Sequence, residues 1–543
     1  MKINKSVMPH FNYLIVTAVW LITCLTGVAV EEYSNGRGGG FWSDPATWRS
    51  GAVPGPDSIV VIGRDDNVIF DRHDVDRVTC GELHIDRKGR LSFKTKAGSI
   101  RASFGGVVES YGAIRLDGTA RRDDRIELRL VGRDATVRKL NLRKGGSLTA
   151  VGRTDTADGK SNVVISAVRD DRKIQYISAT VTGWRGSGLD IKRAQVINIT
   201  IIAHGLDNTG AQFNERLNIT ESLFIGNSNI NMNGCDTPLI LNNRFERQSV
   251  HTFFGGAVQM NGCKLPEIRG NEMIGKYQMG VFSLAITDGA VVNNLVDGAG
   301  VGLYWDGGNV MIQDVTIRNC GTGVQLTDRA KGAIDGLITE NCKEAIIYRG
   351  YMQISNWTVQ NMPEDGRSLV CHHGVLELIN SSIEPAQVVR ESKYEVVHKG
   401  QPGYDKLIND GVLSRPMIQC TYYLVAGLEG DVPTGARIEV KTANPAQPTA
   451  PGAIDPNIRN SPAPILKNNL TPLPGSLISL MVNAWRIETD GTIKEAPTYT
   501  VSVQVPGEQG KFKTIKSVNV TPDSSWFRAE LRAKTPTVRL SLP

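Results

Sequence analysis

Carboxylate side chains recur in the middle of the chain at positions where two of them could act together. Asp306 and Asp328 fall in consecutive repeats of a periodic region. Glycoside hydrolysis needs two carboxylates about 5 to 9.5 Å apart, which neighbouring repeats could supply. Both residues also precede Gly or Arg at an expected turn, where Asp is common for backbone reasons. Catalysis by this pair is therefore one hypothesis, and a structural role in turns is the other.

Basic residues suggest a second chemistry, that of a polysaccharide lyase. A lyase base removes a proton beside a uronate, and Lys276, Arg247 and His251 are the alternative candidates for this role. They lie in or near the longest repeat, whose extra residues predict a protruding loop at the lip of a groove. A plain surface insertion explains the same residues.

These residues sit in a repeat of about 21 residues, which is too short for a helical solenoid. Two apolar residues five positions apart mark each repeat. A straight strand keeps one face at even offsets, so an odd offset requires a bend between them. The pairs are Tyr176/Val181, Ile197/Ile202, Ile219/Phe224, Ile240/Phe245, Ile268/Met273, Val291/Val296, Ile312/Ile317, Ala333/Ile338, Ile354/Val359 and Leu378/Ile383.

Asn or Asp follows two positions after the first member of several pairs, and these residue types tolerate left-handed backbone angles. The predicted corner residues are Asn242, Asn293, Asp314, Asp335, Asn356 and Asn380. A further strand opens with a small residue in most repeats. Coils of this kind stack into a right-handed parallel β-helix, so the fold class is predicted as all-β.

Aligning the strands of successive coils predicts two rows of outward side chains. One row holds Gln259, Phe282, Tyr304, Gln325 and Ile347, and the next holds Asn261, Leu284, Asp306, Thr327 and Arg349. With Arg329 beside them, this face combines aromatic rings, carboxylates and cations. Such a face could stack on sugar rings and pair with the charges of an acidic polysaccharide. The predicted substrate-binding residues are Gln259, Phe282, Tyr304, Gln325, Arg329 and Arg349.

The segment from Gly36 to Ile62 contains W-S-D-P-A-T-W followed by V-P-G and an apolar strand. These motifs resemble the eight-glycine extracellular domain of fibrocystin-like receptors, of hyaluronan-depolymerising proteins of animals and of many exported bacterial proteins. The resemblance covers about Gly36 to Ser147 and implies an extracellular, glycan-linked role. It also implies a following parallel β-helix, as in exported carbohydrate-associated β-helix proteins. Such a turn-rich segment could cover the open edge of a solenoid.

The ends of the chain complete the predicted organisation. Lys2 and Lys5 precede an apolar run, which favours a signal peptide over residues 1–29, with an uncleaved membrane anchor as the alternative. An eight-glycine-like β domain with the first coils follows at 30–147, and the β-helix at 148–390. A connecting segment spans 391–417. Short alternating strands then predict a β-sandwich over 418–543, with a Pro-rich loop at 443–474.

Composition narrows the function classes. The net charge of +6 falls to +4 without Lys2 and Lys5, which leaves 59 basic against 55 acidic residues. In an exported protein this mildly basic balance favours an acidic glycan or an anionic surface over nucleic acid, and a solvated surface without a charged partner is the alternative. Seven of the eight cysteines remain after the signal, without any C-x-x-C pair, so we expect stacked small-residue ladders instead of disulfides or zinc. H-E-x-x-H and G-x-S-x-G are absent. No cofactor is expected, and calcium stays open.

We therefore expect a secreted or cell-surface monomer that binds, and on one hypothesis cleaves, an acidic polysaccharide or cell-surface glycan. An enzyme of this kind would be a polysaccharide lyase or glycoside hydrolase. The alternative is a non-catalytic adhesion protein in which the β-helix is a rigid scaffold, since a fold by itself does not establish activity.

Overall fold

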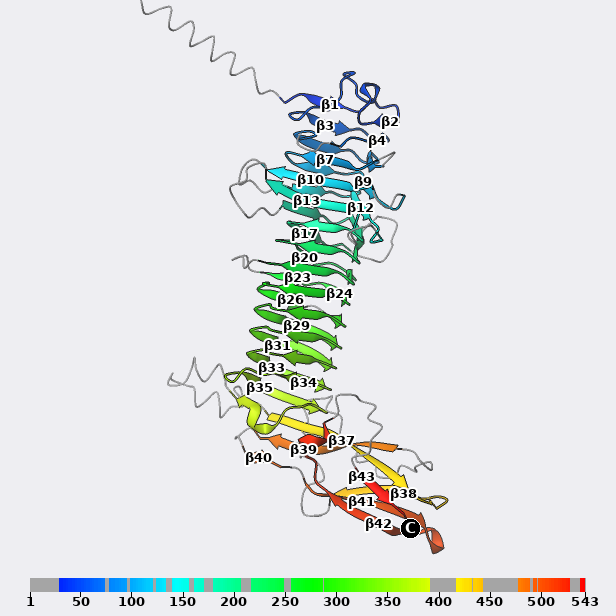
Figure 1. The fold of residues 1–543 in the computed structure, drawn as a ribbon, viewed down its shortest axis with the longest axis vertical. Coiled ribbons are helices and arrows are strands. Elements are labelled where there is room, and N and C mark those ends of the chain that lie inside the picture. Colours follow the sequence, from blue (N-terminus) through cyan, green and yellow to red (C-terminus); the bar gives the residue numbers. More distant parts are fainter. Residues whose placement is uncertain are drawn as a thin grey trace, which may run out of the picture. The chain divides into compact units, whose positions relative to one another are not determined.

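The computed structural model is an all-β protein, with 63% of its described residues in strands and a parallel β-solenoid of about 12 turns (Figure 1). The predicted fold class is thus confirmed. The structure describes residues 29–73, 78–94, 98–120, 124–132, 139–155, 161–169, 179–206, 216–248, 255–286, 288–390, 417–431, 433–442, 477–488, 492–495, 497–527 and 538–542. The predicted signal segment lies outside them, apart from Ala29. Among the described residues, none belongs to an apolar helix of the length needed to cross a bilayer.

The chain divides into two compact units, residues 1–201 with 210–216, and residues 202–209 with 217–543. In the first unit each full coil gives two strands to one sheet and a third strand to another. The first set is β1 Glu31–Tyr33, β2 Gly39–Phe41, β3 Ile59–Ile62, β4 Asn67–Phe70, β5 Glu82–Ile85, β6 Arg90–Phe93, β8 Val108–Ser110, β9 Ala113–Asp117, β11 Lys139–Leu142, β12 Ser147–Val151, β14 Ala179–Gly183 and β15 Gly188–Lys192, with β17 Ile199–His204 at its end. The third strands are β7 Ile100–Phe104, β10 Ile126–Gly132, β13 Val163–Arg169 and β16 Gln195–Ile197.

The second unit repeats the same coil. Its first set is β18 Arg216–Thr220, β20 Asn229–Asn233, β21 Leu239–Leu241, β23 Gly256–Asn261, β24 Lys264–Arg269, β26 Met279–Ile286, β27 Asp288–Val292, β29 Val301–Gln313, β31 Thr322–Asp335, β33 Glu344–Ser355, β35 Arg367–Ile379 and β36 Val388–Arg390. The third strands are β19 Leu223–Ile225, β22 Arg244–Arg247, β25 Glu272–Gly275, β28 Leu295–Asp297, β30 Thr316–Arg318, β32 Ile338–Glu340 and β34 Thr358–Gln360. From β29 onward one long strand replaces the two strands of the first set.

Ladders of identical or similar side chains fill the interior of the second unit. Ile219, Ile240 and Ile268 pair in register on successive strands and are fully buried. Phe224 stacks on Phe245, with ring centroids 4.6 Å apart. Parallel in-register pairing places each apolar residue against its equivalent one coil away, so the repeat itself builds the core.

Polar ladders run beside the apolar ones. The buried amide of Asn271 accepts hydrogen bonds from the backbone N–H of Asn243 (2.9 Å) and from its Nδ2 (3.0 Å), and donates to the carbonyl of Ile240 (2.8 Å). Asn294 repeats the arrangement toward Asn271. All seven cysteines among the described residues are buried.

The corner prediction is confirmed at Asn242, Asn293, Asp314, Asn356 and Asn380, whose φ angles lie between 49° and 55°. It is wrong at Asp335, because Gly336 takes the left-handed conformation in that coil, with φ 69°.

The cause of this error is a slip of one residue. Ile334 pairs with Ile312 and is buried, whereas Ala333 is exposed. Because Ile334 directly follows Ala333 and Thr339 directly follows Ile338, residues 333/338 and 334/339 both fit the five-residue spacing, so the pattern alone allows two registers.

The pair Ile197/Ile202 is also misplaced. Both side chains are only half-buried, and Asn198 takes a left-handed corner with φ 54° between them. The apolar pair five positions apart in this coil is Ile191 and Val196, which are buried on either side of the corner at Arg193. Tyr176 lies outside the described residues.

The C-terminal part contains most of the expected strands. They are β37 Met417–Glu429, β38 Arg437–Thr442, β39 Leu477–Ile487, β40 Ile493–Lys494, β41 Tyr499–Pro506, β42 Phe512–Val520 and β43 Val538–Ser541. β37 pairs in parallel with β35 and antiparallel with β39, whereas β38, β41 and β42 form a separate antiparallel sheet. Short 3-10 turns occur at Pro45–Thr47, Pro385–Gln387, Glu508–Gly510 and Ser524–Trp526. The sandwich arrangement stays a prediction.

Candidate functional site

The first predicted row of side chains is in register on five successive strands. Gln259 of β23 pairs with Phe282 of β26, which pairs with Tyr304 of β29. Tyr304 in turn pairs with Gln325 of β31, and Gln325 with Ile347 of β33. The alignment made from the repeat is therefore confirmed.

The two aromatic residues of this row differ in accessibility. Phe282 is only 1% exposed, whereas Tyr304 is half-buried. Their ring centroids lie 5.3 Å apart, with the ring planes tilted by 60°. Phe282 therefore packs beside Tyr304 on the neighbouring strand, and Tyr304 is the ring that reaches solvent.

The second row is interrupted by β-bulges. Asn261 pairs with Leu284 as expected, but the register shifts between Ser283 and Ile286 and again between Trp305 and Gly307. Asp306 lies within the latter irregularity, just before two glycines. A bulge changes the direction of a side chain and twists the strand locally.

The bulge brings Asp306 and Arg329 together. Gly307 pairs with Arg329, so the Arg329 guanidinium reaches back to donate to the Asp306 carboxylate. The Thr327 hydroxyl donates to the backbone carbonyl of Asp306. Trp305 is fully buried and donates its Nε1–H to the carbonyl of Gly307 at 3.0 Å, which fixes the strand at this point.

Tyr304 lies in the electrostatic field of these groups. Burial raises its pKa, and the Asp306 carboxylate raises it further, while Arg349 and Arg329 act in the opposite direction. The phenol therefore stays protonated at neutral pH and can donate a hydrogen bond. Four of the predicted site residues, Tyr304, Asp306, Arg329 and Arg349, thus belong to one cluster, which we call the Tyr304 face.

The second set of predicted catalytic residues has a different environment. Arg247 is largely buried, with its guanidinium 5.4 Å from the ring centroid of Tyr277, and burial lowers its pKa. Lys276 is exposed, and its backbone N–H donates to the carbonyl of Arg247 at 3.0 Å. His251 lies outside the described residues. Arg247 thus packs on an aromatic ring instead of presenting an open base.

Asp328, the second carboxylate of the predicted hydrolytic pair, has its side chain outside the described part of the structure. Across the described residues, no group of three His, Cys, Asp or Glu side chains is arranged to hold a metal ion.

Sequence reasoning placed Tyr304, Asp306, Thr327 and Arg349 in the two predicted rows, but it missed Trp305 and the bulge that organises the Tyr304 face. The available signal was the Asp306-Gly307-Gly308 sequence, since glycine inside a strand often marks a bulge. Gly308 takes a left-handed backbone angle with φ 90°.

No protein-family model matches the chain, and no curated protein matches it significantly.

Proposed function

We propose that this chain is an exported protein that binds an acidic polysaccharide along the Tyr304 face. The observation that carries the proposal is the grouping of one accessible aromatic ring with two arginines and one carboxylate on adjacent strands. Arg329 is 57% exposed and is oriented by Asp306, which is only 15% exposed. An arginine held in this way is suited to pair with a uronate carboxylate through two parallel hydrogen bonds.

The row to either side of Tyr304 extends the face for a polymer. Gln259 and Gln325 are half-buried and in register with the aromatic pair. Neighbouring strands lie about 4.8 Å apart, so these amides repeat at a short interval along the coil axis. An extended glycan chain could therefore make the same kind of contact on several coils.

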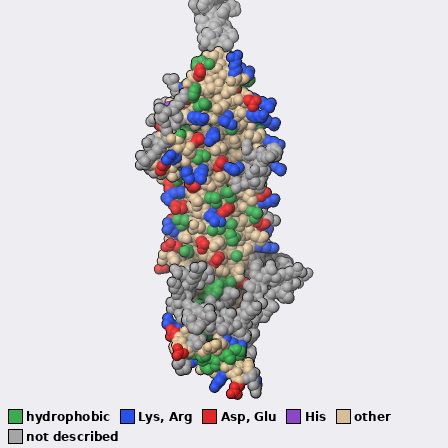
Figure 2. Space-filling model, turned by 90° about the vertical axis from the view of Figure 1, so that its right-hand side faces the viewer, with side chains coloured by type: hydrophobic (Ala, Val, Ile, Leu, Met, Phe, Trp, Pro, Cys, Tyr) green, Lys and Arg blue, Asp and Glu red, His purple; other side chains and the backbone are tan. Residues whose placement is uncertain are grey.

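The distribution of charged side chains on the protein surface favours recognition of a polyanion by a local cluster of residues. Figure 2 shows one face of the molecule, on which Lys and Arg side chains are interspersed with Asp and Glu. Because charges of both signs lie side by side on the described part of this view, a polyanion would depend there on particular arginines. The N-terminal resemblance to eight-glycine extracellular domains supports a glycan as the ligand and an extracellular location.

Binding without cleavage is the second candidate function. The ion pair of Asp306 and the aromatic packing of Arg247 favour it. Asp306 is already paired with Arg329, and Arg247 is packed against Tyr277. A hydrolase of the predicted kind would use Asp306 as one of two carboxylates, and a lyase that used Arg247 would need it as an accessible base. A non-catalytic surface or adhesion protein would need neither.

A binding assay over a panel of uronate polymers tests the proposal. We expect Arg329→Gln to weaken binding about tenfold, or ~1.4 kcal/mol. Arg318→Gln is the matched control, because Arg318 is also partly exposed and paired with a carboxylate, Asp297 at 2.9 Å, but lies on β30 in the other sheet. Equal affinities of wild type and both variants for every polymer would contradict the proposal.

Cleavage is measured on the same polymers through reducing ends and unsaturated uronates. Activity that disappears in Asp306→Asn would assign catalysis to this face. Retention of the polymer without any product would favour the adhesion protein.

A further inference from the structure

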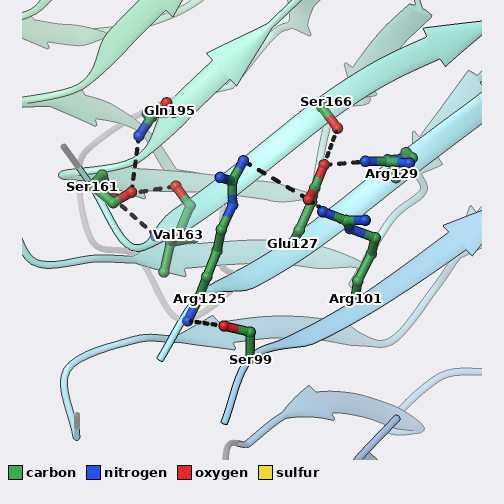
Figure 3. A network of polar contacts seen from close by, with 9 residues as sticks. All are labelled: Ser99, Arg101, Arg125, Glu127, Arg129, Ser161, Val163, Ser166 and Gln195. Atoms are coloured by element: carbon green, nitrogen blue, oxygen red, sulfur yellow. Dashed lines mark hydrogen bonds and ion pairs between the residues drawn. The ribbon is translucent and has the colours of Figure 1, made fainter. Parts of the chain in front are cut away.

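A second charged cluster lies in the first unit, on the sheet formed by the third strands of the coils (Figure 3). Glu127 of β10 pairs in register with Arg101 of β7, and Arg129 of β10 pairs with Ser166 of β13. Arg125 immediately precedes β10. Inward residues of β10, such as Leu128, are fully buried, so Glu127 and Arg129 belong to the outer side of the strand.

Glu127 accepts contacts on both carboxylate oxygens. Its Oε2 accepts a hydrogen bond from Nε of Arg101 at 2.8 Å and lies 3.8 Å from a terminal nitrogen of Arg125. Its Oε1 accepts hydrogen bonds from Nε of Arg129 at 3.3 Å and from the hydroxyl of Ser166 at 2.9 Å. Burial by itself raises the pKa of Glu127, but Arg129, Ser166, Arg101 and Arg125 together outweigh burial and lower it. Glu127 is thus an ionised anchor for the three guanidinium groups.

The cluster has more positive charge than this anchor neutralises. Three arginines surround one carboxylate, which leaves two positive charges in excess among these four residues. A buried glutamate needs a partner to be tolerated, but one or two arginines would satisfy that requirement. The remaining charge is available for another anion.

The guanidinium groups that carry this excess charge are partly accessible to solvent. The Glu127 side chain is only 4% exposed, whereas Arg101, Arg129 and Arg125 are 17%, 21% and 49% exposed. Arg101 and Arg129 reach Glu127 through Nε. Within the described ranges, neither guanidinium donates a hydrogen bond from its two terminal nitrogens. Each arginine therefore keeps the pair of N–H groups that recognises oxyanions in a fork geometry.

We propose that Arg101, Arg125 and Arg129 form an oxyanion-binding site that takes the sulfate or carboxylate group of an anionic ligand. Glu127 is too buried to contact the ligand, and it holds the guanidinium groups side by side. The site is separate from the Tyr304 face and does not depend on the function proposed for it.

The first experiment uses inorganic sulfate as the probe and the full chain as the protein. Sulfate should raise the thermal unfolding temperature of the wild type above its value in chloride of equal ionic strength. Arg125→Gln should lose most of this increase. Arg125 is half exposed and its ion pair is the longest of the three, so this variant should fold even where Arg129→Gln does not.

Arg115→Gln is the control, because Arg115 is exposed, lies in the same unit on β9 and pairs with Asp117 at 3.1 Å. It removes the same charge from a different sheet and should keep the full sulfate effect. An equal sulfate effect in wild type, Arg125→Gln and Arg115→Gln would overturn the site.

Immobilised polymers then distinguish the sources of the oxyanion. Heparin carries sulfates as well as carboxylates, whereas hyaluronan carries only carboxylates. Retention that Arg125→Gln weakens at least fivefold on heparin but not on hyaluronan identifies a sulfate group, and the same weakening on hyaluronan identifies a uronate. Retention on both polymers that is unchanged by Arg125→Gln would count against the proposal. Arg329→Gln tests the Tyr304 face, and Arg125→Gln tests the oxyanion site. Each proposal can therefore be contradicted without affecting the other.

Discussion

Glu127 and Asp306 show two ways in which this protein keeps a carboxylate on the outside of a coil. Glu127 is almost fully buried and is held by three arginines and a serine. Asp306 sits in a bulge and pairs with one exposed arginine, Arg329. Removing Glu127 should therefore affect stability, whereas changing Arg329 should affect mainly binding.

The variant Glu127→Gln tests the first expectation. The lowered pKa of Glu127 means that its contribution to stability is present above the ordinary glutamate value of 4.5 and is lost as the pH falls through the folded-state value. At pH 7 we expect the free energy of unfolding to fall by about 2–3 kcal/mol, because a buried charge pair is broken beside partly exposed partners. The difference should shrink below pH 4.5. Urea denaturation from pH 3 to 7 measures it.

Glu272→Gln provides the comparison, because Glu272 is exposed and paired with Arg244 at 2.5 Å. It should change stability by less than about 1 kcal/mol. A loss in Glu127→Gln that is the same at every pH would show that the ionised carboxylate is not responsible.

At the level of elements, the coil depends on left-handed corners and on buried amide ladders. Asn293 takes φ 51° with an exposed side chain, so its role is in the backbone. Asn271 is fully buried, and its role is in hydrogen bonding. The same residue type therefore serves two purposes one coil apart.

The effect of substituting Asn293 on the free energy of unfolding should depend only on how readily the new residue adopts a left-handed backbone angle. We expect Asn293→Ala to lower the free energy of unfolding by about 1–2 kcal/mol, since a left-handed angle is unfavourable for alanine. Asn293→Gly should lie within about 0.5 kcal/mol of the wild type. Asn309→Ala, at an exposed strand position in β29, is the control. Equal effects of Ala and Gly at position 293 would refute the corner assignment.

Loss of the Asn271 amide should be more damaging. Asn271→Ala removes the acceptor for the backbone N–H and Nδ2 of Asn243, and we expect a destabilisation of about 2–4 kcal/mol in urea unfolding. Asn231→Ala is the matched variant, because Asn231 is half-buried and accepts a hydrogen bond from Asn233 at 3.2 Å. A similar loss in both variants would mean that the ladder adds nothing specific.

At the level of the whole molecule, a solenoid is stabilised by contacts between neighbouring coils, and its first coil needs a cover. In the first unit we expect Trp42 to contribute to this cover, because it is fully buried, with its ring centroid 4.9 Å from that of Trp48 and 5.3 Å from that of Phe70. The Asp66 carboxylate accepts from the backbone N–H groups of Gly36 and Gly38, both at 2.9 Å. The tryptophan motif noted in the sequence thus packs over the first strands.

Trp42→Ala should therefore weaken the end of the coil. We expect a loss of about 3–5 kcal/mol, as for other fully buried tryptophans, accompanied by aggregation through the uncovered strand edge. Trp184→Ala is the control, since Trp184 is 40% exposed. Thermal unfolding followed by light scattering measures both effects. Unchanged stability and solubility in Trp42→Ala would exclude a capping role.

The amino-acid sequence by itself determined the coil and five of the six corners predicted from it, and it aligned Gln259, Phe282, Tyr304 and Gln325 in one row. It could do so because in-register parallel pairing turns a linear repeat directly into neighbours in space. The register predicted at Ala333 was wrong by one residue, because adjacent apolar residues fit two registers there.

Only the tertiary structure decided which polar groups meet. The Asp306–Arg329 pair depends on a bulge that shifts the register. The cluster around Glu127 joins Arg101 and Ser166 across connections of unequal length. Bulges and variable connections do not follow the repeat, so the position of a side chain relative to the next coil is set by pairing and packing, and not by sequence spacing.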